Sequence, residues 1–158
     1  MVLTTGEPAG WPEPEEGRAW INLVKVLLVL PGALESQLLR DSDLTLLGYM
    51  ILSRLAAIPG ETLRMSEVAE MANGSLPRIS HAVTRLEDRG WVERRVQTGR
   101  GRRFTLVSLT ETGRAHVEAA APDHVATIRR LAVEPLGDDF LAVCTAAARI
   151  VETLGLPT

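Results

Sequence analysis

The stretch RMSEVAEMANGSLPRISHAVTRLEDRG, which runs from Arg64 to Gly90, decides the fold because it predicts two helices joined by a tight turn. Ser66 is a good N-cap residue for the first helix, and the apolar residues that follow it have helical spacing. Asn73 and Gly74 supply the turn, since both residue types tolerate a positive φ angle. We therefore expect a helix-turn-helix in this part of the chain.

The second of these helices has two faces of different chemistry. Ser75 is placed to cap it, and Pro77 is acceptable because it lies in the first turn. One face is apolar and is predicted to be buried, and it comprises Ile79, Val83 and Leu86. The other face is polar and is predicted to be separate from the first, and it comprises Arg78, His81 and Arg85.

A β-hairpin with a basic tip is predicted directly after this helix. The segments WVERRV (91–96) and FTLVSL (104–109) are rich in β-branched and aromatic residues, and QTGRGR (97–102) between them is typical of a hairpin loop. Three arginines outside the tip are expected to pair with nearby carboxylates or to touch phosphate at most. They are Arg89, Arg94 and Arg95, and the carboxylates are Glu87, Asp88 and Glu93.

Helices are also predicted on both sides of this unit. A first helix is expected at about 15–39, kinked or broken at Pro31 and Gly32. A second helix follows an Asp43 cap and ends at 59–61. Thr110 caps a long helix that reaches about Val133, with one buried stripe made of Ala121, Val125, Ile128 and Ala132.

A final helix follows the turn at 135–137, and Cys144 lies on its apolar stripe, where a small core residue is the expected role. Residues 1–14 are rich in proline and are predicted to form a disordered or loosely docked lead. The predicted fold class is mainly α with a small β-hairpin wing, in the α+β sense.

Composition and charge limit the possible functions. Between Leu76 and Arg103, eight arginines stand against three acidic residues, a balance of +5, whereas the whole chain has a formal charge of −3. The remaining 130 residues therefore carry −8. Such asymmetry suggests that one face meets a polyanion while the rest keeps the protein soluble.

Other classes are disfavoured. The most apolar run, at 26–30, is far shorter than the roughly 20 residues that cross a bilayer, and the N-terminus does not resemble a signal peptide. A single cysteine, Cys144, excludes an intrachain disulfide and makes the cytoplasm the default location. No catalytic set or phosphate-binding loop is present, so an enzyme is not expected, and neither is a cofactor.

Helix, turn, helix and basic hairpin follow one another in the order of a winged helix-turn-helix. A helix fits the major groove of DNA, and an arginine-bearing hairpin tip can enter the adjacent minor groove. The run LRMSEVAEMANGSLPRISHAVTRLEDRGWVERR, followed downstream by VSLTETG, resembles bacterial transcription regulators of the MarR (multiple antibiotic resistance regulator) family. The resemblance covers roughly residues 44–133, and the flanking helices match by pattern only.

The resemblance implies a homodimer that binds a pseudo-palindromic operator in double-stranded DNA, most often as a repressor. Residues 15–42 and 112–158 would form the helical dimerisation region, and residues 43–111 the DNA-binding lobe. The family pattern places base and backbone contacts on the recognition helix at Ser75, Arg78, Ser80, His81, Thr84 and Arg85. It places minor-groove contacts on the wing at Arg100, Arg102 and Arg103.

The wing departs from the family pattern. The family usually carries an Asp-x-Arg pair there, in which the aspartate holds the arginine. Alignment from Trp91 puts Arg100 in the place of the aspartate, and alignment back from SLTETG puts Gly101 there. The loop is one residue longer than usual and offers no acid in either alignment, so the wing arginines are expected to be more mobile.

Family members also release DNA when small aromatic or lipophilic effectors bind between the two regions. Four residues are candidates for lining such a pocket here, and each is an equally good core residue: Trp20, Leu23, Tyr49 and Met50. Two alternatives stay open, namely a winged-helix module that binds protein and a redox or metal sensor on the same scaffold. His116 and His124 are eight residues apart, which does not match the i, i+4 spacing of a chelating pair.

Overall fold

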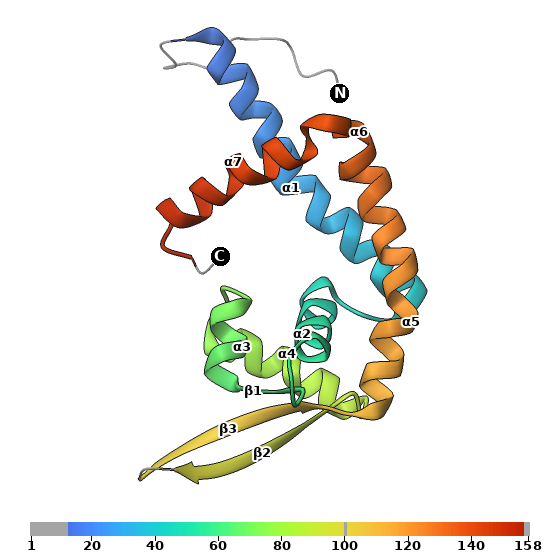
Figure 1. Ribbon diagram of the computed structural model, residues 1–158, viewed down its shortest axis with the longest axis vertical. Helices are drawn as coiled ribbons and strands as arrows, with labels where there is room; N and C mark the ends of the chain where they lie inside the picture. The colour runs from blue at the N-terminus through green and yellow to red at the C-terminus, as the bar shows by residue number, and fades with distance from the viewer. Residues whose placement is uncertain (1–12, 100, 157–158) are drawn as a thin grey trace.

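The computed structural model describes residues 13–99 and 101–156, which form a mainly helical chain with one small sheet (Figure 1). The elements follow the order α1 (Pro14–Ser42), α2 (Leu46–Ala57), β1 (Thr62–Arg64), α3 (Met65–Met71), α4 (Leu76–Asp88), β2 (Val92–Gly99), β3 (Arg102–Leu109), α5 (Glu111–Ile128), η1 (Arg129–Val133), α6 (Glu134–Leu136), η2 (Gly137–Asp139) and α7 (Phe140–Thr153). The predicted fold class and the hairpin are confirmed. The lead at 1–12 and Arg100 lie outside the described residues.

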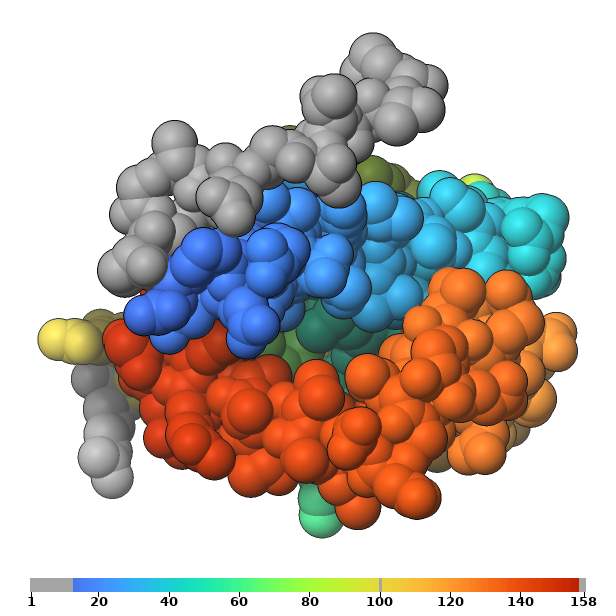
Figure 2. Space-filling view, turned by 90° about the horizontal axis from the view of Figure 1, so that it is seen from above, coloured from blue at the N-terminus to red at the C-terminus, as the bar shows by residue number. Residues whose placement is uncertain are grey.

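The elements are arranged in two ends that α5 connects. α1, α6 and α7 lie at one end, whereas α2, α3, α4 and the sheet lie at the other (Figure 1). α5 begins beside the sheet and runs toward the first end. Seen from above, α1 and the run from α5 to α7 form two bands across that end (Figure 2).

The boundary between α1 and α2 differs from the prediction. α1 continues as one helix of 29 residues through Pro31 and ends where Asp43 adopts a left-handed backbone with φ of 52°. α2 is capped by Thr45 instead, whose Oγ1 accepts a hydrogen bond from the Gly48 N–H at 3.0 Å. The prediction of an Asp43 cap is therefore wrong, because the Asp43 N–H still bonds to the last carbonyls of α1.

The start of α3 also differs. The helix begins at Met65, with Arg64 in the N-cap position. The Arg64 N–H donates to the carboxylate of Glu67 at 2.5 Å, so an acidic residue in the first turn satisfies the free backbone donor. The prediction that Ser66 caps the helix is wrong, since Ser66 already lies inside it.

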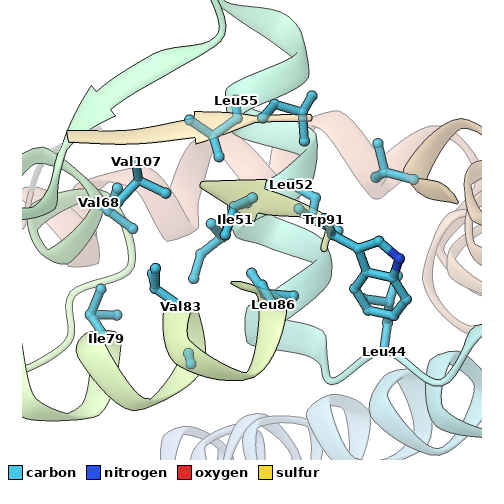
Figure 3. Packing of buried hydrophobic residues seen from close by; sticks show 14 of the residues in the cluster. Leu44, Ile51, Leu52, Leu55, Val68, Ile79, Val83, Leu86, Trp91 and Val107 are labelled. Carbon is cyan, nitrogen blue, oxygen red and sulfur yellow. The ribbon is translucent and has the colours of Figure 1, made fainter. Parts of the chain in front are cut away.

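One hydrophobic core holds the second end together. The predicted stripe of α4 is confirmed: Ile79, Val83 and Leu86 are buried against α2 and the sheet. In Figure 3 the labelled side chains of α2 and α4 point toward one another, with Val107 and Trp91 of the sheet region beside them. Full burial of one such side chain contributes roughly 1.5–3 kcal/mol, so this cluster fixes the position of α4.

The sheet has three antiparallel strands in the order β1-β3-β2. The sequence did not predict β1, which is only three residues long and pairs Leu63 with Val107 and Arg64 with Leu106. β2 and β3 are longer than predicted, because pairing continues to Gly99 opposite Arg102. The strands thus extend into the segment 97–102 that was expected to be a loop.

The predicted Thr110 cap is confirmed and ties α5 to the end of α4. The Thr110 Oγ1 accepts from the Gly113 N–H at 2.9 Å and donates to the Gly90 carbonyl at 2.7 Å. Gly113 lies directly on the backbone of Trp91, since a Cβ added to it would be 2.0 Å from the Trp91 carbonyl oxygen. Only glycine allows this close approach, so the first turn of α5 packs directly on Trp91, which lies between α4 and β2.

The face of α5 that packs inward is not the predicted stripe. Four other residues of α5 are buried at helical spacing: Val117, Ala120, His124 and Thr127. Val125, on the predicted stripe, is 49% exposed. An apolar pattern misses this face because two of its four members are polar, and His124 is accommodated by a hydrogen bond from its Nδ1 to the Gln37 Oε1 at 2.9 Å.

α1 and α7 expose much of their apolar surface. None of the residues of α7 is buried, and Cys144 is exposed, so its predicted place in a core is wrong for the single chain. Leu28 of α1 and Leu141 of α7 are 76% and 74% exposed. α1 is also long and apolar enough to cross a membrane by length and composition, contrary to the expectation from the run at 26–30, because Pro31 does not break it.

Candidate nucleic-acid interface

α4 presents a polar face beside its buried stripe. Its N-terminus is free for contact because Ser75 and Pro77 start the helix at the surface. Arg78, His81 and Arg85 are all exposed, as predicted from their spacing. These three side chains can therefore reach a partner while Ile79, Val83 and Leu86 hold the helix on the core.

Ser80 and Thr84, two of the predicted contact residues on α4, are half-buried. The Thr84 hydroxyl donates to the Ser80 carbonyl oxygen one turn earlier, at 2.9 Å. This bond leaves the lone pairs of Thr84 Oγ1 available as acceptors. Thr84 suits a partner that donates a hydrogen bond, whereas the arginines on either side suit a partner that accepts.

A groove of about 540 Å³ runs along this face of α4. Residues of three helices and of the turn before α2 line it: Glu35, Thr45, Leu47, Arg78, His81, Thr84 and Arg85. Glu35 comes from α1 and was not predicted here, because its distance in sequence from α4 hides the contact. The groove is thus lined by two arginines of α4 and by one glutamate of α1.

The first wing strand is fixed to the end of α4 by Arg94 and Glu87. The Arg94 Nε donates to the Glu87 Oε2 at 2.7 Å, and the Arg94 backbone N–H donates to the other carboxylate oxygen at 3.0 Å. The Arg94 guanidinium, together with these bonds, holds the pKa of Glu87 below its usual range. The expected pairing of Arg95 with Glu93 is confirmed at 3.0 Å, whereas Arg89 pairs with Asp43.

The wing itself is a long hairpin that projects from the lobe (Figure 1). Arg102 and Arg103 are exposed, and within the described residues no carboxylate forms an ion pair with either of them. Arg100 lies outside the described residues. Gly101 has a φ of 75°, a left-handed conformation that glycine adopts without strain in the short connection from Gly99 to Arg102.

The remaining histidines have structural partners. His116 stacks on Trp91 with ring centroids 4.0 Å apart, and its Nε2–H donates to the Ser42 carbonyl oxygen at 2.9 Å. His124 is buried beside the Tyr49 ring, and burial lowers its pKa. Within residues 13–99 and 101–156, no three His, Cys, Asp or Glu side chains are placed to hold a metal ion.

A sequence model described as MarR family matches residues 42–103. The solved structure of Sco3205, a MarR family transcriptional regulator from Streptomyces coelicolor in complex with DNA, is 32% identical to this chain, with a TM-score of 0.84. The match covers 94% of this chain and 96% of that chain. This chain belongs to the MarR family.

Two further structures are similar to this chain. AbsC, a MarR family transcriptional regulator from Streptomyces coelicolor, is 32% identical with a TM-score of 0.83, over 91% of this chain and 97% of that chain. CouR from Rhodococcus jostii RHA1, bound to p-coumaroyl-CoA, is 24% identical with a TM-score of 0.67, over 89% and 93%, and shares the fold. A search of curated proteins finds no match.

Membership in the MarR family explains the arrangement of α4 and the hairpin, and it makes the chain a DNA-binding transcriptional regulator. MarR regulators are not enzymes, which agrees with the missing catalytic set. In MarR terms, α3 and α4 form the helix-turn-helix and β2 and β3 form the wing. Three features of this region were not predicted from local sequence patterns, namely β1, Glu35 and Arg64, and Arg64 lies close to the wing.

The four residues considered for a MarR effector pocket are not brought together in one chain. Tyr49 contacts His124, with ring centroids 4.4 Å apart, and His124 bonds to Gln37 in the second half of α1. Trp20 lies 17 positions before Gln37, which corresponds to about 25 Å along the helix. Trp20, Leu23 and Met50 are each at least 39% exposed, so within one chain only Tyr49 is packed inside.

Proposed function

We propose that this MarR regulator acts as a homodimer that binds a pseudo-palindromic operator in double-stranded DNA and represses the genes beside it. The observation that carries the proposal is the exposed row of Arg78, His81 and Arg85 on a helix whose other face is fixed in the core. A helix held in this way can enter the major groove without losing its position on the lobe. Sco3205, the relative that covers nearly all of this chain, was crystallised in complex with DNA.

The division of labour follows the two ends of the molecule. Residues 43–111 would form the DNA-binding lobe, and 15–42 with 112–158 would form the dimerisation region. α1 and α7 support this role because they expose apolar side chains in a number that is unusual for a monomer. The most exposed are Val26, Leu27, Leu28 and Val29 on α1, Leu141 and Ile150 on α7, and Leu154 directly after α7.

A second copy of the chain explains this apolar surface better than a membrane does. The family consists of DNA-binding transcriptional regulators, and we place this protein in the cytoplasm, where its DNA would be. A dimer would bury the apolar residues of α1. It would also cover α7, and Cys144 would then lie in the covered surface. The two lobes of such a dimer would contact half-sites about one helical turn apart, roughly 34–36 Å.

The contacts would divide between base reading and charge neutralisation. Arg78 and Arg85 would reach base edges or nearby phosphates from α4, with Ser75, Ser80, His81 and Thr84 around them. Arg100, Arg102 and Arg103 would enter the minor groove, where the negative potential is concentrated. Loss of an arginine that reads a base costs roughly 1–3 kcal/mol and relaxes sequence preference, whereas loss of a phosphate contact weakens binding to all sequences.

Release of DNA would follow the binding of a small aromatic or lipophilic effector between the two ends. CouR, which shares the fold, was crystallised with p-coumaroyl-CoA. Trp20, Leu23, Tyr49 and Met50 would contribute to such a site, with Tyr49 on the wall beside His124. Since an effector shifts the equilibrium only by its differential affinity, it must bind the free dimer more tightly than the DNA-bound dimer.

The central experiment is selection of bound sites from random and genomic DNA by the purified protein. We expect a pseudo-palindrome, and light scattering should give the mass of a dimer. Binding should weaken steeply as salt rises, because each neutralised phosphate contributes about −0.9 to the slope of log K against log salt. Absence of any retained DNA at low salt would favour a winged-helix module that binds protein.

The wing arginines give a second test. Replacement of Arg100 and Arg102 by alanine should weaken binding and flatten the salt dependence, since up to two phosphate contacts per subunit are removed. An unchanged slope would show that the wing does not touch DNA. Replacement of Cys144 by serine should leave DNA binding and release unchanged, and a lost oxidant response in that variant would favour the redox sensor.

A further inference from the structure

The half of the wing nearer its tip carries a contact that joins all three strands of the sheet. β1 ends at Arg64, which pairs with Leu106 of β3. Side chains two residues apart on a strand lie on the same face, so Arg64 and Phe104 share one face of the sheet. The inward face is the other one, because it carries the buried Val107. Arg64 and Phe104 therefore lie on the outer face.

The Arg64 guanidinium covers the Phe104 ring on this outer face. Its central carbon is 4.6 Å from the ring centroid, within the range of a cation–π interaction. Arg64 is anchored on the lobe, because its N–H is held by Glu67 at the start of α3. The contact thus joins the fixed body of the lobe to the strand that returns from the wing tip.

The same ring also contacts β2. A Cβ added to Gly99 would lie 3.1 Å from the Phe104 Cε1, so the ring occupies the space that a side chain at this position would need. Phe104 is half-buried as a result, although it lies beyond the end of β1. One aromatic side chain therefore touches β1 through Arg64 and β2 through Gly99.

Three arginines line a hollow beside this contact, and the Glu67 carboxylate lies close to one of them, since it accepts from the Arg64 backbone N–H. This hollow of about 670 Å³ is lined by five residues of this region: Arg64, Gly99, Arg102, Arg103 and Phe104. Within the described residues, none of these three arginines forms an ion pair with a carboxylate side chain. Arginines that line one hollow and form no ion pair with a carboxylate can bind a phosphate of the DNA backbone.

We propose that Arg64 is a positioning residue for the wing and also binds a DNA phosphate. By stacking on Phe104 it sets the angle of the hairpin, and it adds its positive charge to the hollow that Arg102 and Arg103 also line. This rests on the proposed DNA-binding function. The stacking of Arg64 on Phe104 would hold the wing in place from the body of the lobe. In the family pattern, an aspartate within the wing holds the wing arginine.

The first test measures binding of R64Q to a double-stranded fragment that the wild-type protein has selected from random DNA. Two lost cation–π contacts per dimer, at about 0.5–1 kcal/mol each, correspond to binding that is about 5- to 30-fold weaker. Two lost phosphate contacts reduce the salt slope by about 1.8. R54Q removes the same charge from an exposed position of α2 and should bind like the wild-type protein.

The second test separates the ring from the charge. F104L should weaken binding although no charge is lost, and F104Y, which keeps the ring, should bind like the wild-type protein. In the double variant R64Q/F104L the losses should be clearly less than additive, because both changes break one contact. A spin label at the exposed Thr98 should become more mobile in F104L and R64Q before DNA is added.

The outcomes distinguish this inference from the proposed function. A wild-type protein that retains no DNA overturns the proposed function. If the wild-type protein binds, then R64Q with wild-type affinity and slope overturns the role of Arg64. Additive losses in the double variant, with unchanged mobility at Thr98, overturn the positioning contact. Circular dichroism and thermal unfolding of each variant confirm that the lobe is folded.

Discussion

Arg94 of the first wing strand grips both carboxylate oxygens of Glu87 near the end of α4, one with its side chain and one with its backbone N–H. The recognition helix and the wing are therefore connected by a polar contact in addition to the core. Both side chains are about one-third exposed, so solvent weakens the ion pair without abolishing it.

Glu87→Gln is expected to reduce the free energy of unfolding by about 0.5–1 kcal/mol at neutral pH, because the charge-assisted bonds become neutral ones. Glu93→Gln, which breaks the more exposed pair with Arg95, is the control and should change little. Urea unfolding of the two variants measures the difference. Equal losses of unfolding free energy in the two variants would show that the Arg94–Glu87 contact stabilises the fold no more than the exposed Arg95–Glu93 pair does.

The same pair predicts a pH dependence. The pKa of Glu87 is lowered in the folded state, mainly by the Arg94 side chain, so its contribution is complete above the ordinary glutamate pKa of about 4.3. It is lost as the pH falls through the lowered folded value. Glu87→Gln should therefore lose less stability than the wild-type protein on acidification below about pH 4.5, as followed by thermal unfolding.

Gly113→Ala is expected to destabilise the protein by about 1–3 kcal/mol or more, since the added Cβ would meet the Trp91 backbone and force α5 away from the sheet. Gly32→Ala is the matched change in α1, where an added Cβ has nothing within 4 Å. That variant should gain roughly 0.5–1 kcal/mol in helix stability. Denaturant unfolding of both variants tests the contrast, and similar effects would contradict the packing at Gly113.

His124 is expected to make the fold sensitive to moderately acidic pH. Burial lowers its pKa, so the unfolded chain takes up a proton more readily than the folded one, and stability falls as the pH drops below about 6.5. His124→Leu should remove this part of the pH dependence. It should also cost about 1–3 kcal/mol at neutral pH, because the buried Gln37 loses its partner.

A second variant identifies the cause of that loss. Replacement of both Gln37 and His124 by leucine removes the two polar partners together, which is expected to restore much of the stability. Unfolding midpoints measured between about pH 8 and pH 5 compare the three proteins. If the single variant keeps the wild-type pH profile, the buried histidine is not the group that titrates.

Glu35→Gln is expected to strengthen DNA binding. Glu35 lines the same groove as Arg78 and Arg85 and brings a negative charge to the surface that would meet phosphate. At a separation of about 10 Å in water, its removal from both subunits corresponds to about 2- to 5-fold tighter binding. Glu134→Gln removes the same charge from an exposed position of α6, at the end of the molecule away from α4, and should have no effect (Figure 1). Fluorescence anisotropy with labelled DNA measures both.

Local patterns predicted most of the DNA-binding lobe. The two faces of α4, the hairpin and the Thr110 cap follow from residues a few positions apart, and the structure confirms each of them. β1 could not be predicted, since three residues form a strand only because β3 lies beside them. Arg64 was missed for the same reason, because its partner Phe104 is 40 positions away in the sequence.

The helices at the other end were predicted less well. The inward face of α5 contains His124, whose polarity excludes it from an apolar stripe until Gln37 of α1 is known to be its partner. Cys144 and the rest of α7 follow an apolar pattern but are not buried in one chain, and the proposed dimer would supply the surface that covers them. Apolar periodicity indicates which face of a helix is apolar. It does not indicate whether the same chain or another molecule covers that face.

The close approach of Gly113 to Trp91 has a consequence for how such regulators diverge. α4, the wing and the first turn of α5 meet at this point, so we expect them to move as one rigid piece. In the proposed dimer, the bases that are read would depend on side chains that project from that piece, whereas the distance between two such pieces would depend on the far ends of α1 and α5. Operator sequence and operator spacing can therefore evolve as separate traits.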